Sequence, residues 1–142
     1  MKVADILQAK GNIIYSVTGS TTVYEAIKVM GEKNIGALLV LEGGKLTGIL
    51  SERDYARKVV LKGKASRETS VSDIMTADVI TVMPSDTIET CMELMTQKHI
   101  RHLPVLDGDG QVIGVVSIGD LVKETISQQQ FVIKQLEHYI AG

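Results

Sequence analysis

The apolar positions of the chain change period several times, and the order of the changes predicts the secondary structure. A short β-rich run, IIYSV in residues 13–17 and VITV in residues 79–82, precedes Ser- and Thr-rich residues that can cap a helix. Apolar residues at helical spacing come next: Val23, Ala26, Ile27 and Met30 in one copy, and Ile88, Cys91, Met92 and Met95 in the other. Two β-rich runs joined by a glycine-bearing acidic turn then predict a hairpin, and a serine opens a second helix. The pattern indicates a β-α-β-β-α unit that occurs twice.

The two copies align as an internal repeat. Residues 16–40 superpose on residues 81–105 at a constant offset of 65, which becomes 66 after the hairpin turn, where EGGK is replaced by DGDGQ. A turn accepts the extra residue because a slip within a strand would move its side chains to the other face. The segments VADIL at Val3 and VSDIM at Val71 also match, so each half begins with a short helical turn.

The repeat divides the chain into parts. We expect a first unit with its N-terminal helical turn in residues 1–66, a second unit in residues 67–124, and an amphipathic C-terminal helix in residues 125–142. Each unit is too small to cover both faces of its sheet, so the two units are expected to pack around one core. With 44% hydrophobic and 23% charged residues, a chain of 142 residues fits such an aliphatic-cored domain.

The second helix of each unit begins with the same motif, GILSERD in the first and GVVSIGD in the second. Ser51 and Ser117 open these helices, whose N-termini offer unpaired backbone N–H groups and a partial positive charge that favour a phosphate. Asp54 and Asp120 lie about one turn further on, where an ionised carboxylate can accept hydrogen bonds from the vicinal hydroxyls of a ribose. The glycine of each motif is expected to leave room for a base to approach the strand.

A serine followed three residues later by an aspartate is also a capping box, in which the two side chains satisfy each other's backbone donors with no ligand present. This alternative explains Ser51 with Asp54 and Ser117 with Asp120, but it explains neither the glycine nor the repeated context. We therefore favour nucleotide binding and keep a purely structural role as the alternative.

These residues resemble a known family. GILSERD, GVVSIGD, IGALLVLE and IRHLPVLD are similar to the motifs of the CBS domain, named after cystathionine β-synthase, which occurs in tandem pairs called Bateman modules; the resemblance covers residues 3–124. It implies an α/β (α+β) fold in which two pseudo-twofold related β-α-β-β-α motifs pack sheet to sheet as one module. It also implies an adenosine-containing ligand, AMP, ADP, ATP or NAD, in the cleft between the motifs, and a homodimer, because similar modules commonly pair into flat dimers.

The resemblance also assigns the phosphate end of the ligand, where the two copies differ. Similar modules use basic residues just before Leu-Pro to reach ligand phosphates, so Arg101 and His102 of KHIRHLP carry over. The first copy has Gly36 and Ala37 at these places, so we expect two clefts of unequal affinity, or one occupied cleft. Arg53, in the first turn of its helix, either supplies charge to the first motif or is a solvated surface arginine, and the sequence does not decide between the two.

Composition and motifs argue against several other functions. A net charge of −2 disfavours a protein that coats nucleic acid, which needs a strongly basic face. No apolar run is long enough to span a bilayer, and the start MKVADILQAKG is not a secretory signal, so we expect a cytoplasmic protein without membrane partners. The single cysteine, Cys91, falls on the core side of a helix, and His99 and His102 have no third partner at zinc spacing. We therefore expect no catalytic residue, no catalytic cofactor and no metal.

Two segments lie outside the repeated motifs. The basic stretch from Lys58 to Arg67 is interpreted as a solvated linker rather than an anion-attracting rim. The C-terminal run has apolar residues at helical spacing, namely Phe131, Val132, Leu136, Tyr139 and Ile140. Such a helix buries its stripe on its own module or on another chain, and the second is favoured.

The sequence thus predicts a regulatory or sensor module that binds an adenine nucleotide and acts on an unidentified effector protein. A structural or interaction module with unoccupied clefts is the alternative, and a cofactor-using enzyme is a third hypothesis without visible chemistry.

Overall fold

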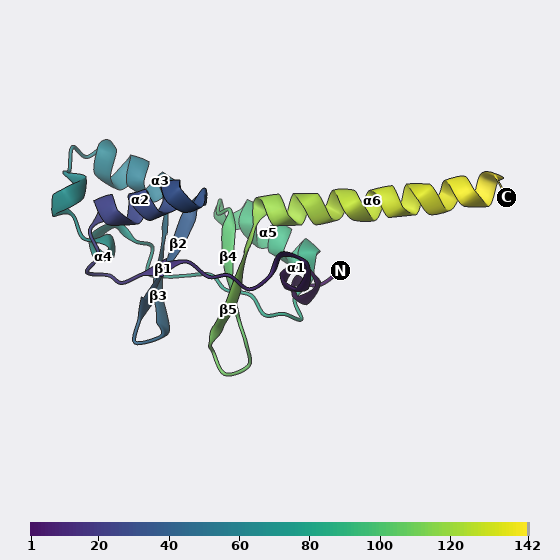
Figure 1. Cartoon of the computed structure of the whole chain (residues 1–142), viewed down its shortest axis with the longest axis horizontal. Helices are drawn as coiled ribbons and strands as arrows, with labels where there is room; N and C mark the ends of the chain where they lie inside the picture. Colours follow the sequence, from purple (N-terminus) through teal and green to yellow (C-terminus); the bar gives the residue numbers. More distant parts are fainter. Residues whose placement is uncertain (142) are drawn as a thin grey trace.

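The computed structural model describes residues 1–141, which form two repeats beside one another and one long helix that projects from them (Figure 1). The elements up to the end of the first repeat are α1 (Val3–Lys10), β1 (Ser16–Val17), α2 (Val23–Lys33), β2 (Ala37–Glu42), β3 (Lys45–Ser51), α3 (Glu52–Tyr55) and the π-helix η1 (Ala56–Val60). The remaining elements are the 3-10 helix η2 (Ser66–Glu68), α4 (Val71–Ile74), α5 (Ile88–Lys98), β4 (His102–Leu106), β5 (Val112–Ser117) and α6 (Ile118–Ala141). The predicted mixed α/β fold of two related motifs is confirmed.

Each repeat builds its sheet on an antiparallel hairpin, β2–β3 in the first and β4–β5 in the second. Both ladders shift register at corresponding places, after Val40 and after Val105. The leading β-rich runs add little: β1 pairs in parallel with β2 through two residues, and the second run makes one parallel bridge, from Val82 to Val105. The extended segments are thus shorter than predicted, because only these residues pair with a hairpin edge.

The first long helix of each repeat, α2 or α5, begins and ends in the same way. Thr22 and Thr87 are the N-caps, and each hydroxyl accepts a hydrogen bond from the backbone N–H three residues on, at 3.2 and 3.1 Å. Asn34 and His99 end the helices in the left-handed region, with φ of 54° and 55°. Equivalent residues therefore lead into equivalent strands, β2 and β4.

Burial divides the interior into two clusters, one for each repeat, instead of the single core predicted from the size of the units. Valines and leucines of the first hairpin pack on α2, and the cluster is completed by Val71 and Ile74 of α4. The second hairpin packs on α5 and on Leu121 of α6, and its cluster is completed by Val3 and Ile6 of α1. Each leading helix, α1 or α4, therefore packs on the repeat that it does not directly precede.

The motif glycines lie where these leading helices meet the hairpins. A Cβ on Gly114 would come 2.6 Å from Cδ2 of Leu7 in α1, and a Cβ on Gly48 would collide with the Met75 side chain. Leu7 and Met75 correspond in the matching segments VADIL and VSDIM. The expectation that the glycines admit a base is therefore wrong, because side chains of the protein already fill the space beside them.

The tail is one continuous helix with the start of the second motif. α6 runs unbroken from Ile118 to Ala141, so the second-motif helix and the predicted C-terminal helix form a single element; Gly142 lies outside the described residues. Leu121 is buried, whereas every residue from 131 to 141 is exposed. Figure 1 shows the yellow end of α6 reaching away from the two repeats. Within the described residues, the apolar stripe of the tail is not folded back onto its own module.

Candidate functional site

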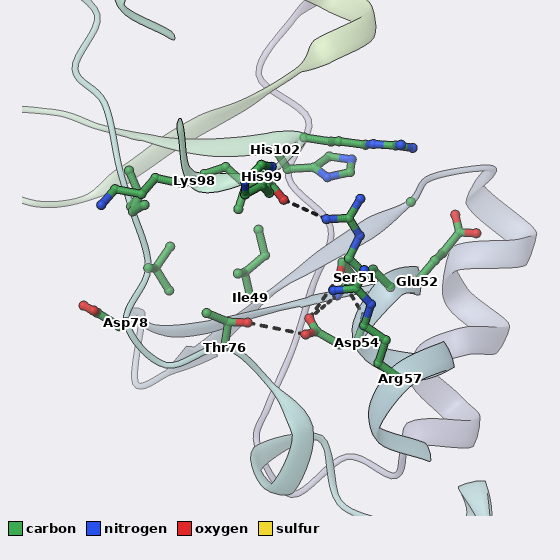
Figure 2. A pocket seen from close by; sticks show the side chains of 16 residues that line it. Ile49, Ser51, Glu52, Asp54, Arg57, Thr76, Asp78, Lys98, His99 and His102 are labelled. Carbon is green, nitrogen blue, oxygen red and sulfur yellow. Dashed lines mark hydrogen bonds between the residues drawn. The ribbon is translucent and has the colours of Figure 1, made fainter. Parts of the chain in front are cut away.

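A cavity of about 550 Å³ lies between the two repeats, beside the start of α3 and the end of α5. The predicted site residues that line it are Ser51, Arg53, Asp54, Arg101 and His102 (Figure 2). The first three come from the first repeat and the last two from the second. Ser117 and Asp120 do not line this cavity. The structure therefore brings the first motif together with the basic residues of the other repeat.

Asp54 is held at the cavity wall by a capping box at the start of α3. Its Oδ2 accepts hydrogen bonds from the backbone N–H and the hydroxyl of Ser51, both at 3.0 Å. Its Oδ1 lies 3.1 Å from Nζ of Lys58 and 3.5 Å from the hydroxyl of Thr76, as Figure 2 shows for Thr76. These four donors account for the roughly four lone-pair sites of the carboxylate, so a ribose hydroxyl would take the place of the long contact from Thr76. The capping role predicted as the alternative is present, and it is compatible with a ligand.

Arg53 ties the two repeats together across the cavity. Its Nη1 donates a hydrogen bond of 2.8 Å to the carbonyl of His99, the residue that ends α5. The C-terminus of a helix carries a partial negative charge, which favours a guanidinium there. Arg53 also lines the cavity, and a guanidinium has further N–H groups to offer an anion. The side chain is thus more than a solvated surface arginine.

Arg101 and His102 enter the cavity beside the small residues of the first repeat. A Cβ on Gly36, the counterpart of Arg101, would lie 3.5 Å from Cε1 of His102. That distance is an ordinary van der Waals contact, so Gly36 lies directly beside the imidazole; the atom nearest to such a Cβ would be Oε1 of Glu52, at 3.1 Å. Burial lowers the pKa of His102, although the carboxylate of Asp120 acts in the opposite direction. The net effect holds the pKa of His102 below its ordinary value, and a bound anion would shift it upward.

The second motif forms the same capping box with a different partner. Oδ2 of Asp120 accepts a hydrogen bond of 2.8 Å from the N–H of Ser117, and Nζ of Lys10 in α1 lies 2.7 Å from the same oxygen. The ammonium also donates to the carbonyl of Val115 at 2.9 Å. Burial raises the pKa of Asp120, but the hydrogen bonds from Lys10 and Ser117 outweigh it and hold that pKa below its ordinary value. Lys10 therefore competes with any ligand hydroxyl for this carboxylate.

The sequence analysis missed the segment that follows α4. The N–H and carbonyl of Thr76 pair with Ile49 of β3 at 2.9 and 3.0 Å, which brings residues 76–80 to the cavity wall. Ile49, Val79 and Ile80 make that wall apolar, and Asp78 adds a carboxylate. The match of VADIL with VSDIM could have pointed to this segment, because the same alignment pairs Asp78 with Lys10, the residue that contacts the second motif.

The remaining chemical candidates lie elsewhere. Cys91 is buried in α5; burial, and after it the charge of Asp86, raises the pKa of its thiol to about 11, so no thiolate forms at neutral pH. In the part of the chain that the structure describes, no three His, Cys, Asp or Glu side chains gather as a metal site. No helix within residues 1–141 combines the length and apolar character needed to cross a membrane.

The sequence and the fold have parallels in known proteins. A family model for the CBS domain matches residues 3–61 and again residues 71–127. The chain belongs to the CBS domain family. The predicted resemblance is therefore confirmed, and the two matched stretches coincide with the two repeats of the structure.

Other CBS proteins cover nearly all of the chain. The mitochondrial CBS domain-containing protein CBSX3 of Arabidopsis thaliana is 40% identical over 152 residues, which cover 99% of this chain and 72% of that protein. A solved CBS-domain protein from Burkholderia ambifaria is 56% identical with a TM-score of 0.88, covering 91% of this chain and 96% of that one. A CBS domain pair solved with 5′-methylthioadenosine and S-adenosyl-L-methionine is 26% identical with a TM-score of 0.80, covering 90% of this chain and 98% of that one.

Proposed function

We propose that this CBS pair binds an adenine nucleotide in the cavity between its repeats and regulates a partner protein, with no reaction of its own. One observation carries the proposal: the carboxylate of Asp54 and the basic side chains of Arg53 and Arg101 line one cavity although they come from different repeats. A nucleotide needs an acceptor for its ribose and cations for its phosphates, and the cavity supplies both.

The ligand is proposed to lie with its ribose at Asp54 and its phosphates toward Arg53, Arg101 and His102. Ser51 opens α3 and offers its hydroxyl near the sugar. The base then lies against the apolar wall of Ile49, Val79 and Ile80. The class of ligand is AMP, ADP, ATP or NAD, and the relative that was solved with two adenosine-containing molecules supports this class.

Ser117 and Asp120 are proposed as a second, weaker site. Their motif matches the first, but they do not line the cavity, and Lys10 lies 2.7 Å from the Asp120 carboxylate, closer than the 3.1 Å between Lys58 and Asp54. A ligand at this place has to displace an ammonium from the carboxylate. We therefore propose two binding steps of unequal affinity, with the cavity of Asp54 filled first.

The setting of the module is part of the proposal. We propose a homodimer in the cytoplasm, an effector protein not yet identified, and neither nucleic acid nor membrane as a partner. The exposed stripe of α6 supports an assembly of chains, and a hexameric CBS-containing protein of cyanobacteria, 28% identical, shows that such proteins assemble. The rival function is a structural or interaction module whose cavities stay empty, and the residues of the capping box alone would satisfy it.

Calorimetric titration with AMP, ADP, ATP, NAD and S-adenosylmethionine separates the two functions. The proposal expects saturable binding of at least one of them, with 2′-deoxy-AMP bound more weakly than AMP because Asp54 loses a hydroxyl. Replacing Arg101→Ala should weaken AMP about tenfold or more and leave adenosine nearly unchanged, since a charged hydrogen bond contributes roughly 1.5–3 kcal/mol. If none of the ligands binds, the structural module is the correct function; if 2′-deoxy-AMP binds as well as AMP, the role of Asp54 is wrong.

A further inference from the structure

α6 has an apolar seam that the fold leaves uncovered. Its members are four and three residues apart in alternation, the spacing of the a and d positions of a coiled coil: Val122, Ile126, Gln129, Ile133, Leu136 and Ile140. The five apolar members are all exposed, from Val122 at 44% to Ile140 at 83%. A contiguous exposed apolar surface of this kind marks an interaction site.

The seam lies on a different side of α6 from the module. Leu121 is buried, and Thr125 and Gln128 are half-buried, so these residues mark the side of the helix that faces the repeats. Every residue from 131 to 141 is exposed, and Figure 1 shows that part of the helix projecting away from the repeats. A second helix can therefore approach the seam from solvent.

The residues beside the seam distinguish two directions of pairing. The e positions of the heptads are Lys123, Gln130 and Glu137. In an antiparallel pair each e position faces an e position of the other helix, so a pair centred near Gln130 sets Lys123 of each copy against Glu137 of the other. In a parallel pair each e position faces a g position of the other helix. Lys123 would then meet the apolar Ile118, and Glu137 would meet the apolar Val132. Charge complementarity therefore favours the antiparallel direction.

We propose that a second copy of this chain covers the seam, with the two α6 helices packed antiparallel. The inference rests on the homodimer of the proposed function and specifies its geometry. The layers are Val122 with Ile140 of the second copy, Ile126 with Leu136 of the second copy, and Gln129 with Ile133 of the second copy, each occurring twice. The seam extends for about 27 Å along the helix, at 1.5 Å a residue.

One side chain of the layers, Gln129, and two outside them, Val132 and Phe131, agree with this arrangement. Gln129 lies close to the twofold axis, where one polar residue in an apolar seam fixes the register of a coiled coil. Val132, at a g position, meets its own copy across the axis in the antiparallel register. Phe131, which is 64% exposed, lies on the opposite side of α6 and takes no part in the contact.

Sedimentation velocity of the full chain at micromolar concentration tests the seam. The wild type should be a dimer, Ile133→Asp should be a monomer, and Phe131→Asp should remain a dimer. The two replaced residues are both exposed on the same helix, so neither variant removes a core contact of the single chain. A wild-type monomer, or a dimer that withstands Ile133→Asp, would overturn the proposal.

A charge exchange tests the direction of pairing. Lys123→Glu and Glu137→Lys should each weaken the dimer about tenfold, because two attractive ion pairs become two repulsive ones. The double variant Lys123→Glu/Glu137→Lys should restore the wild-type affinity. The two residues are about four helical turns apart, too far to pair within one chain, so restoration reports a contact between copies. Loss without restoration excludes the antiparallel pair.

Nucleotide binding by the same variants separates this inference from the proposed function. No residue of α6 lines the cavity of Asp54, so Ile133→Asp should bind AMP as the wild type does. If AMP binds but the dimer ignores the α6 variants, the helix pair is wrong and the ligand proposal stands. If the dimer follows the variants but no nucleotide binds, the helix pair stands and the ligand proposal fails.

Discussion

The motifs that open α3 and α6 are alike in sequence and differ in surroundings. In both, a serine and an aspartate form a capping box at a helix start. Asp54 then turns toward a cavity lined by the second repeat, whereas Asp120 holds Lys10 at 2.7 Å. Each carboxylate is paired with a lysine, Asp54 with Lys58 at 3.1 Å and Asp120 with Lys10 at 2.7 Å, and of the two it is Asp54 that lines the cavity.

The difference comes from residues outside the motifs. Lys10, at the end of α1, corresponds to Asp78, which follows α4. The lysine that α1 brings to Asp120 therefore has an acidic counterpart among the residues that line the cavity of Asp54. Gly36 and Arg101 also correspond: Gly36 lies beside the imidazole of His102 at the cavity wall, whereas Arg101 adds a cation to that wall. A repeat can therefore preserve its binding motif while its neighbours decide which copy is open to a ligand.

The largest expected effect is a contrast between the two carboxylates. Asp54→Asn should weaken AMP binding about a hundredfold, because two hydrogen bonds from ribose to a charged group are worth roughly 3 kcal/mol together. Asp120→Asn should change the first binding step less than about twofold, since Asp120 does not line that cavity. Calorimetric titration of both variants measures the contrast. Equal losses would mean that the two motifs serve one site.

A smaller effect is expected from opening the second motif. Lys10→Met removes the ammonium from Asp120 and keeps the length of the side chain, so a ribose no longer has to displace a cation. The affinity of the second binding step should rise about tenfold, because a partly exposed contact between charged groups no longer has to be broken. Lys2→Met, at the residue that precedes the same helix, is the matched control and should leave both steps unchanged. An unaltered second step would show that Lys10 does not block the site.

The smallest effect concerns pH and His102, whose counterpart Ala37 does not titrate. Burial lowers the pKa of His102 below its ordinary value of 6.5, so between the two values the unfolded chain binds more protons than the folded one. The contribution of neutral His102 to the free energy of unfolding is fully present above pH 6.5. It is lost as the pH falls below that value, because the unfolded chain then takes up a proton more readily. The melting temperature of the wild type should therefore drop from pH 7.5 to pH 5.5 by about 2 °C more than that of His102→Gln. Parallel curves for the two proteins would contradict this.

Much of the fold follows from the sequence because the repeat is visible in it. The offset between Val17 and Val82 predicts both hairpins and both long helices, and the change of offset falls in the turn, as register requires. The capping boxes of Ser51 and Ser117 are likewise local, and both are present. Local patterns of this kind depend on neighbours in the chain, which the sequence states directly.

What the sequence did not predict depends on contacts between distant segments. No local feature of VADIL indicates that Leu7 packs against Gly114, so the space beside this glycine was expected to admit the base of a ligand. The contact of Lys10 with Asp120 joins positions at opposite ends of the chain. The π-helix over Ala56–Val60 also has no signal in the apolar spacing.

The exchange of leading helices sets an order for folding during synthesis. α4 follows the first hairpin in the chain, so the first core can close as soon as Ile74 has been made. α1 is made before the first repeat, but the cluster that buries Val3 includes Val116 and Leu121, which are made after it. A nascent chain therefore carries an unattached α1 beside a finished first repeat until the second hairpin emerges. The residues of α1 thus precede the first repeat in synthesis and follow it in burial.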